Sequence, residues 1–137
     1  MAAAIFADML RHQGHNDLVC VRSAGIWATE GEAAMPQAQT VMHDRGLDIS
    51  SHRAHHLTLE DIRQADLIVA MECSIAETLA IEDRSCAERV HHLGELADVP
   101  RDVEDPIGRS LEDYRYTADV LHGMMQRAYS RILSLIV

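Results

Sequence analysis

The spacing of apolar residues predicts helices at both ends of the chain and three more between them. Apolar positions three and four residues apart, as on one side of an amphipathic helix, run through the first thirteen residues and again through a much longer C-terminal stretch. Pro36 suits the first turn of a second helix, and the hydroxyl of Thr58 suits the cap of a third. The five predicted helices cover residues 1–13, 36–45, a short stretch from 58, 74–82 and 111–135.

Three short apolar runs have the length and composition of strands. They cover residues 18–22, 66–71 and 90–93, and the second is apolar almost throughout, as in a strand covered on both faces. Strands that alternate with helices form a parallel sheet with helices on both sides. The sequence therefore predicts an α/β fold, a three-layer α/β/α sandwich with a small parallel sheet, formed by a single domain over residues 1–137.

Charge and cysteine usage narrow the class of protein. The net charge is −10, whereas nucleic acids and anionic membranes are bound by clustered cations, so neither is expected as a partner. The three cysteines lack the spacing of a disulfide scaffold, which suits a reducing compartment. The N-terminus lacks the basic region of a signal peptide, and no apolar run is long enough to span a membrane. We therefore expect a cytoplasmic protein.

One loop, Asp-Pro-Ile-Gly at residues 105–108, is built to hold a carboxyl group in a defined direction. Pro106 fixes its own φ and pushes Asp105 toward an extended conformation, while Gly108 permits a tight turn. A carboxyl group held in this way can act as a general acid, although the same residues also make an ordinary turn. Loops that follow parallel strands share one edge of the sheet, so we expect this loop near the Ser-Ala-Gly turn at residues 23–25.

Five stretches of the chain, taken in order and spacing, match the motifs of one enzyme family. They are an N-terminal helix, the Ser-Ala-Gly turn, a stretch that ends in His-x-Ala, an apolar strand, and the Asp-Pro loop with its closing helix: residues 1–6, 23–25, 46–54, 65–71 and 105–114. Together they resemble the bacterial branch of the low-molecular-weight protein tyrosine phosphatase family, part of an arsenate reductase-like superfamily. The resemblance covers nearly all of the chain.

The resemblance implies a phosphomonoester hydrolase that works through a phosphocysteine. In the family, a Cys thiolate in a Cys-x-x-x-x-x-Arg-Ser loop attacks the phosphate, and the Arg of that loop stabilises the equatorial oxygens. Asp105 stands at the position of the general acid, and Ser23 and His52 stand where the family has residues that hold the phosphate loop in shape. No cofactor is implied. The substrate is a phosphorylated protein or a small phosphate ester, with phosphotyrosine and phosphoarginine both open.

Two apolar side chains are candidates for the substrate cleft. The family usually has an aromatic residue after Asp-Pro, and here that residue is Ile107. Trp27 either forms another wall of the cleft or is a half-buried loop residue, and the sequence leaves both interpretations open.

The nucleophile loop of the family is not found in this sequence. None of Cys20, Cys73 and Cys86 has an Arg six positions later. In the family, a first strand and this loop precede the stretch that residues 1–6 resemble, and that central strand lies between the strands matching residues 18–22 and 66–71. We therefore expect an N-terminally truncated domain that is inactive or weakly active as given, with unpaired backbone groups on both neighbouring strands.

Two other functions stay open beside the hydrolase. A non-catalytic phosphatase-like protein would bind a partner, and unpaired strands would allow an oligomer to form by strand pairing. Arsenate reduction needs the N-terminal Cys and a second pair of cysteines, for which Cys73 and Cys86 are candidates without a redox motif around them.

No metal site is expected. The histidine pairs at residues 55–56 and 91–92 have no Cys or carboxylate at a recognisable ligand spacing, so we interpret them as surface histidines. Cys20 is interpreted as a plain buried thiol. Cys73 is either another buried thiol or, near a helix start, a thiol with a lowered pKa.

Overall fold

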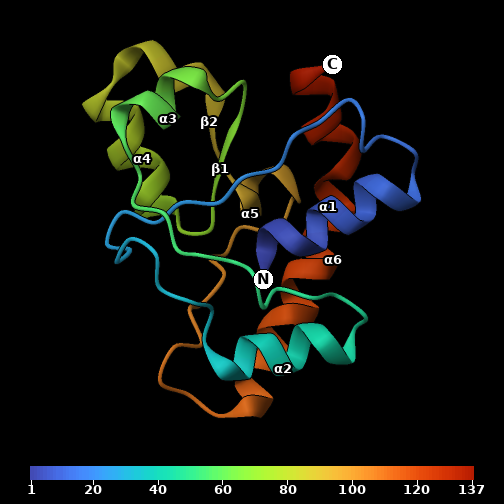
Figure 1. Ribbon diagram of the computed structural model, residues 1–137. Coiled ribbons are helices and arrows are strands. Elements are labelled where there is room, and N and C mark those ends of the chain that lie inside the picture. Colours follow the sequence, from blue (N-terminus) through green and yellow to red (C-terminus); the bar gives the residue numbers. More distant parts are fainter. The chain divides into compact units, whose positions relative to one another are not determined.

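A computed structural model describes residues 1–137, which divide into two compact units that are described separately below (Figure 1). Unit 1 comprises residues 1–57 and 105–122, and unit 2 comprises residues 58–104 and 123–137. In chain order the elements are α1 (Ala2–His12), α2 (Pro36–Asp44), α3 (Leu59–Gln64), β1 (Ile68–Ala70), α4 (Cys73–Glu82), the 3₁₀ helix η1 (Arg84–Arg89), β2 (Val90–His92), α5 (Leu93–Leu96) and α6 (Leu111–Ile136).

Unit 1 is built from α1, α2 and the first half of α6. Each of these helices buries the apolar side that its sequence spacing predicts, because that spacing places the side chains on one face. Two ion pairs join the end of α2 to α6, between Arg45 and Asp119 and between Asp44 and Arg115. The buried apolar side chains of these three helices are Ile5, Phe6, Leu10, Ala38, Val41, Met42, Tyr114, Ala118 and Leu121.

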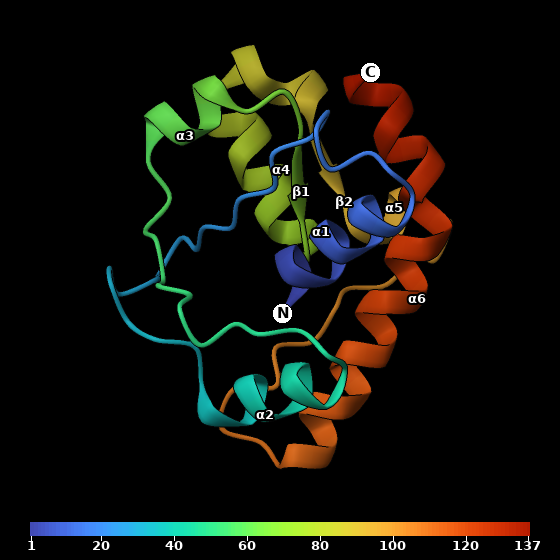
Figure 2. The same ribbon diagram turned by 45° about the vertical axis from the view of Figure 1, so that its right-hand side comes forward.

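Unit 2 contains the sheet, which has two parallel strands. Ile68 of β1 pairs with Val90 of β2, and Ala70 pairs with His92. Figure 2 shows the two strands side by side with α4 next to them, and α4 contacts both strands. A crossover through α4 and η1 joins the strands, as a parallel pair requires. The predicted α/β class with a small parallel sheet is therefore present.

The strand predicted over residues 18–22 is wrong. Residues 19–24 are not part of any ladder, and the side chain of Leu18 is 65% exposed. A strand exists only where a neighbouring strand takes up its N–H and C=O groups, and apolar spacing does not reveal whether such a neighbour is present. In unit 1 the extended segments meet only at two isolated bridges, Gly25 with His56 and Ala33 with Arg53.

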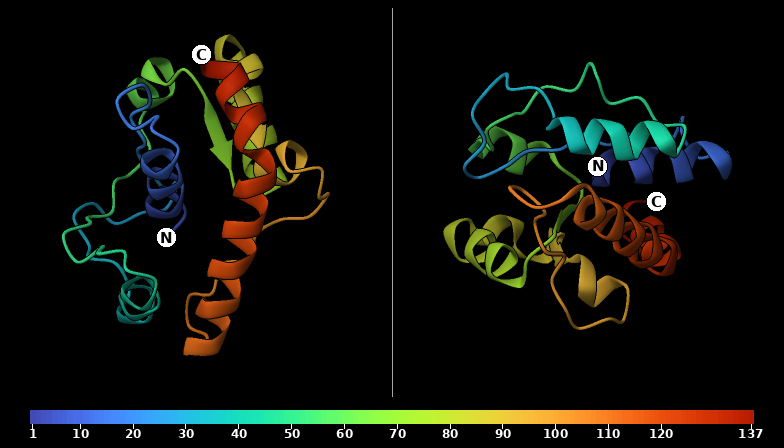
Figure 3. Two further views of the ribbon diagram at one scale, coloured as in Figure 1. Left: turned by 90° about the vertical axis from the view of Figure 1, so that its right-hand side faces the viewer. Right: turned by 90° about the horizontal axis from the view of Figure 1, so that it is seen from below.

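All five predicted helices form, and two short ones were not predicted. Thr58 caps α3 as expected, because its hydroxyl accepts from the Asp61 N–H while the Asp61 carboxylate accepts from the Thr58 N–H. The unpredicted elements are η1 and α5, each too short to show a helical period. Figure 3 shows α6 as one continuous ribbon. Neither α6 nor any other helix combines the length and the hydrophobicity that crossing a membrane demands.

Gly94 in α5 is a position where any side chain should destabilise unit 2. A Cβ there would lie 2.5 Å from the Arg101 carbonyl oxygen, 2.6 Å from that of Val99 and 2.5 Å from Cε1 of His92. Backbone oxygens do not swing aside, so Gly94→Ala should lower the free energy of unfolding by roughly 1–3 kcal/mol in urea denaturation. The control is Gly123→Ala in α6, where a Cβ meets no atom within 4 Å.

The control should change stability in the opposite direction. Replacing glycine by alanine in an unobstructed helix position raises stability by about 0.5–1 kcal/mol, because alanine loses less conformational entropy on folding. Equal shifts of the urea midpoint for both variants would contradict the close packing around Gly94.

Candidate functional site

The Asp105 loop belongs to unit 1 and is fixed by its own backbone and by Pro106. An Asp105 carboxylate oxygen accepts a hydrogen bond from the Ile107 N–H at 3.0 Å, which closes an Asx turn. The Arg109 N–H donates to the Pro106 carbonyl at 2.9 Å, and Gly108 takes the left-handed conformation (φ 76°) that the turn needs. Pro106 is buried, whereas Asp105 is exposed. The loop therefore has the stiffness predicted from Asp-Pro-x-Gly, and it presents its carboxyl group outward.

The start of α6 holds the other end of this loop. The Ser110 hydroxyl accepts from the Asp113 N–H at 3.2 Å, and the Asp113 carboxylate accepts from the Ser110 N–H at 3.0 Å. The Ser110 hydroxyl and then its N–H lower the pKa of Asp113, which keeps the cap ionised. One turn later, Tyr114 is buried; burial, and secondarily the negative charge of Asp105, raise its pKa. Asp105 thus lies in the loop that leads to a capped helix start, and its charge acts on the buried Tyr114.

The segments that carry Ser23 and His52 lie next to each other in unit 1. The Gly25 N–H donates to the His55 carbonyl at 2.9 Å, and the Leu57 N–H donates to the Gly25 carbonyl at 3.0 Å. This parallel bridge pairs Gly25, two residues after Ser23, with His56, four residues after His52. The two positions expected to support a phosphate loop are therefore on paired segments.

Ser23 and His52 are both exposed. The backbone of His52 is held in a turn, because its N–H donates to the Ile49 carbonyl at 3.1 Å and its own carbonyl accepts from the Arg53 guanidinium at 2.7 Å. Their role in holding a phosphate loop stays a prediction.

The two candidate cleft residues are strongly exposed. Trp27 is 86% exposed and Ile107 is 61% exposed. The interpretation of Trp27 as a half-buried loop residue is therefore wrong. Large apolar side chains this exposed, on the same unit as Asp105, are available for contact with a ligand.

Asp102 is a residue that the sequence analysis missed. Its carboxylate oxygen Oδ1 accepts from the Cys73 N–H at 2.8 Å, at the start of α4, and lies 3.0 Å from Nε2 of His92, at the end of β2. The next residue, Val103, is buried and donates its N–H to the Met71 carbonyl at 3.0 Å, just beyond β1. The chain leading into the Asp105 loop is thus anchored in unit 2 at the carboxyl ends of both strands. In the sequence, the only signal for Asp102 was its position after a strand.

Two interpretations made from the sequence need correction, one of a histidine and one of two cysteines. His92 is buried against Asp102 and is not a surface residue. Cys20 and Cys73 are exposed and not buried. The charge of Glu77, followed by partial desolvation, raises the pKa of Cys73, so this thiol is less reactive than an ordinary one. Cys86 is fully buried, with its Sγ 2.9 Å from the Asp83 carbonyl oxygen. These environments do not favour a redox pair.

A small hollow of about 170 Å³ in unit 1 does not involve the candidate site. It is lined by residues of α1, of the chain after α2 and of α6, and none of these is a predicted site residue: Ile5, Asp8, Arg45, Leu47 and His122.

Comparison with known proteins decides the family. The family model for low molecular weight phosphotyrosine protein phosphatase matches residues 1–132. The chain belongs to this family. Among curated relatives, it is 32% identical to a probable low molecular weight protein-tyrosine-phosphatase, EpsP, of Ralstonia nicotianae, over 85% of this chain and 79% of that protein. It is 30% identical to a protein-arginine-phosphatase of Bacillus subtilis, over 93% of this chain and 83% of that protein.

Solved structures of the family confirm the fold. The low molecular weight protein tyrosine phosphatase of T. tengcongensis superposes with a TM-score of 0.88 at 34% identity, over 95% of this chain and 88% of that chain. In the present chain, the stretch matched by the family model includes all the candidate site residues: Ser23, Trp27, His52, Asp105 and Ile107. The 137 residues of the present chain contain no Cys that is followed by an Arg six positions later.

Proposed function

We propose that the chain works as a phosphomonoester hydrolase of its family, with Asp105 as the general acid, when a Cys-x-x-x-x-x-Arg loop is present ahead of Met1. The relatives named as tyrosine and arginine phosphatases support a phosphorylated protein as substrate. The observation that carries the proposal is the Asp105 loop, in which the exposed carboxyl group directly precedes a buried Pro106 and the capped start of α6 follows.

The proposed reaction has two steps. In the first, the thiolate attacks phosphorus and the bond to the leaving oxygen breaks, while the Asp105 carboxyl group gives that oxygen its proton. In the second, the Asp105 carboxylate takes a proton from water as the water oxygen attacks the phosphocysteine. The P–S bond then breaks, the thiolate is restored and phosphate leaves. One carboxyl group serves both steps because the first step leaves it ionised.

Two protein substrates fit the proposal, phosphotyrosine and phosphoarginine. Exposed Trp27 and Ile107 give the site apolar surface against which an aromatic ring or the stem of an arginine side chain can pack. Location in the cytoplasm is part of the same proposal and is supported by three free cysteines.

Intact mass and N-terminal sequencing of the protein from its own source test the proposal. We expect residues ahead of Met1 that contain Cys-x-x-x-x-x-Arg-Ser. A protein that begins at Met1 would leave Asp105, Ser23 and His52 without the loop they are proposed to serve, and would overturn the assignment of a phosphocysteine mechanism to this chain.

A second candidate is a non-catalytic protein that associates through strand pairing. The sheet has only two strands, so β1 pairs with β2 along one edge and no strand pairs with its other edge. Free edges of this kind can accept a strand from another chain, and a two-stranded sheet alone is marginal.

Sedimentation velocity tests this second candidate. Pairing through β1 predicts a dimer or higher oligomer whose proportion rises with protein concentration. A single monomeric species across the concentration range would count against strand pairing.

A further inference from the structure

The loop that carries Trp27 leaves and rejoins one extended segment, residues 53–57, at two fixed points. At its start, the Gly25 N–H donates to a carbonyl of that segment at 2.9 Å. At its end, the Gly31 N–H donates to another carbonyl of the segment at 2.8 Å. The five residues between these points, 26–30, form the exposed loop. Both ends of the loop are therefore anchored by backbone alone, whatever the side chains are.

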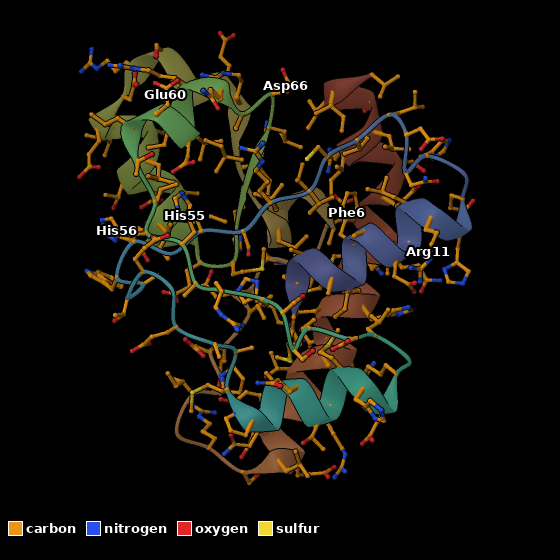
Figure 4. The ribbon with its side chains drawn as sticks, viewed as in Figure 1. Phe6, Arg11, His55, His56, Glu60 and Asp66 are labelled. Atoms are coloured by element: carbon orange, nitrogen blue, oxygen red, sulfur yellow. The ribbon has the colours of Figure 1, made fainter.

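Glu30 adds a third anchor from inside the loop. One carboxylate oxygen accepts from the His56 N–H at 2.7 Å, and the other lies 3.2 Å from Nδ1 of His55. Figure 4 labels both histidines on the segment that leads toward α3. The His56 N–H, followed by the His55 ring, lowers the pKa of Glu30, so the carboxylate stays ionised and the bond stays charge-assisted.

The geometry of the bridge explains why His56 needs this acceptor. Gly25 uses the carbonyl of His55 and the N–H of Leu57, which point to one side of the segment. Along an extended segment the N–H groups alternate in direction, so the N–H of His56 points to the opposite side. The Glu30 carboxylate lies on that side and accepts from the His56 N–H, which the backbone bridge does not use.

Trp27 takes its position from this loop. It lies in a tight turn in which the Ala28 N–H donates to the Gly25 carbonyl at 3.3 Å. Because the indole is 86% exposed, side-chain packing contributes little to where it stands. The backbone of residues 26–30 must therefore hold it.

We propose that Glu30 is a positioning residue, whose carboxylate fixes the Trp27 loop to the segment that follows His52 and thereby sets where the indole stands. Its effect on substrate rests on the proposed function, whereas its effect on the loop does not. Two kinds of measurement separate these parts.

The first measurement is on the loop itself, in the 137-residue chain. Trp27 is the only tryptophan, so its fluorescence anisotropy reports the mobility of this loop alone. Glu30→Ala, which removes both acceptor oxygens, should lower the anisotropy, whereas Glu30→Gln keeps an amide oxygen that can accept from the His56 N–H and should lower it less. Hydrogen exchange of the His56 amide should become roughly three- to tenfold faster, because a charged acceptor has been removed from an exposed donor. The matched control is Glu32→Ala, which makes the same truncation two residues further on.

The outcomes are distinct. Lower anisotropy and faster His56 exchange in Glu30→Ala, with a smaller change in Glu30→Gln and none in the Glu32→Ala control, support the proposal. Values for Glu30→Ala equal to those of the control overturn it, and circular dichroism of each variant establishes that the fold is retained.

The second measurement uses a form of the protein with an active nucleophile loop. Loss of a correctly placed wall weakens substrate binding more than chemistry, so Glu30→Ala should raise KM for an aryl phosphate while kcat changes little. A fall in kcat with KM unchanged would contradict a positioning role for Glu30. Absence of all activity in the parent protein would instead overturn the proposed function and leave the anisotropy result standing.

Discussion

The Asp105→Asn substitution should slow hydrolysis of phenyl phosphate by roughly 10²–10⁴-fold in a form of the protein that carries the nucleophile loop. The amide oxygen can still accept from the Ile107 N–H, so the Asx turn and the loop should persist. The amide N–H is far too weakly acidic to protonate the leaving oxygen. Steady-state kcat/KM measures the effect.

The leaving group provides a sharper test of the same assignment. A nitrophenolate needs little protonation when it departs, whereas a phenolate needs more, so the loss caused by Asp105→Asn should shrink as the pKa of the leaving phenol falls. Glu104→Gln, the same kind of change at the exposed neighbouring residue, serves as the control and should leave this dependence as it was. If Asp105→Asn slows all leaving groups equally, Asp105 does not act as the general acid.

The helices could be predicted from the sequence because their signals are local. The capping residues Thr58 and Ser110 each bond to a partner three residues along the chain, and the apolar stripes repeat within a few turns. The stiffness of the Asp105 loop is local in the same sense, since Pro106 and Gly108 act on their own backbone angles. These features depend on nothing far away in the sequence.

The strands show the limit of such signals. Residues 66–71 and 90–93 were predicted as strands and pair with each other as β1 and β2, while residues 18–22 had the same kind of apolar run and pair with nothing. The difference lies in whether a partner strand is present, which is a property of the whole fold. The composition of a segment and the alternation of its apolar residues do not reveal whether a partner strand is present.

The contacts that shape the candidate site are equally non-local. Glu30 meets His56 across 26 residues, and Asp102 meets Cys73 across 29. The spacing of these residues along the chain does not reveal either contact. Only the structure shows that Glu30 accepts from the His56 N–H and that Asp102 accepts from the N–H at the start of α4.

A strand and a Cys-x-x-x-x-x-Arg-Ser loop placed ahead of Met1 should strongly raise the phosphatase activity of the 137-residue chain. The gain has two physical sources. The loop brings the thiolate nucleophile and an Arg for the equatorial oxygens, and each lost anion-stabilising group of this kind typically costs 10²–10³-fold in rate. The start of α1 also suits the role, because no side chain caps it and no acidic residue lies in its first turn. Its free N–H groups and its dipole favour a bound phosphate.

The control for this experiment is the same extended protein with the loop Cys replaced by Ser. It should bind inorganic phosphate as the active form does and show no turnover, which separates repair of the fold from supply of the nucleophile. Urea denaturation of the extended and unextended chains then measures how much the added strand stabilises the sheet through its backbone hydrogen bonds. Hydrolysis by the unextended chain at a rate comparable with that of the extended form would rule out the phosphocysteine mechanism, because none of Cys20, Cys73 and Cys86 has the required Arg.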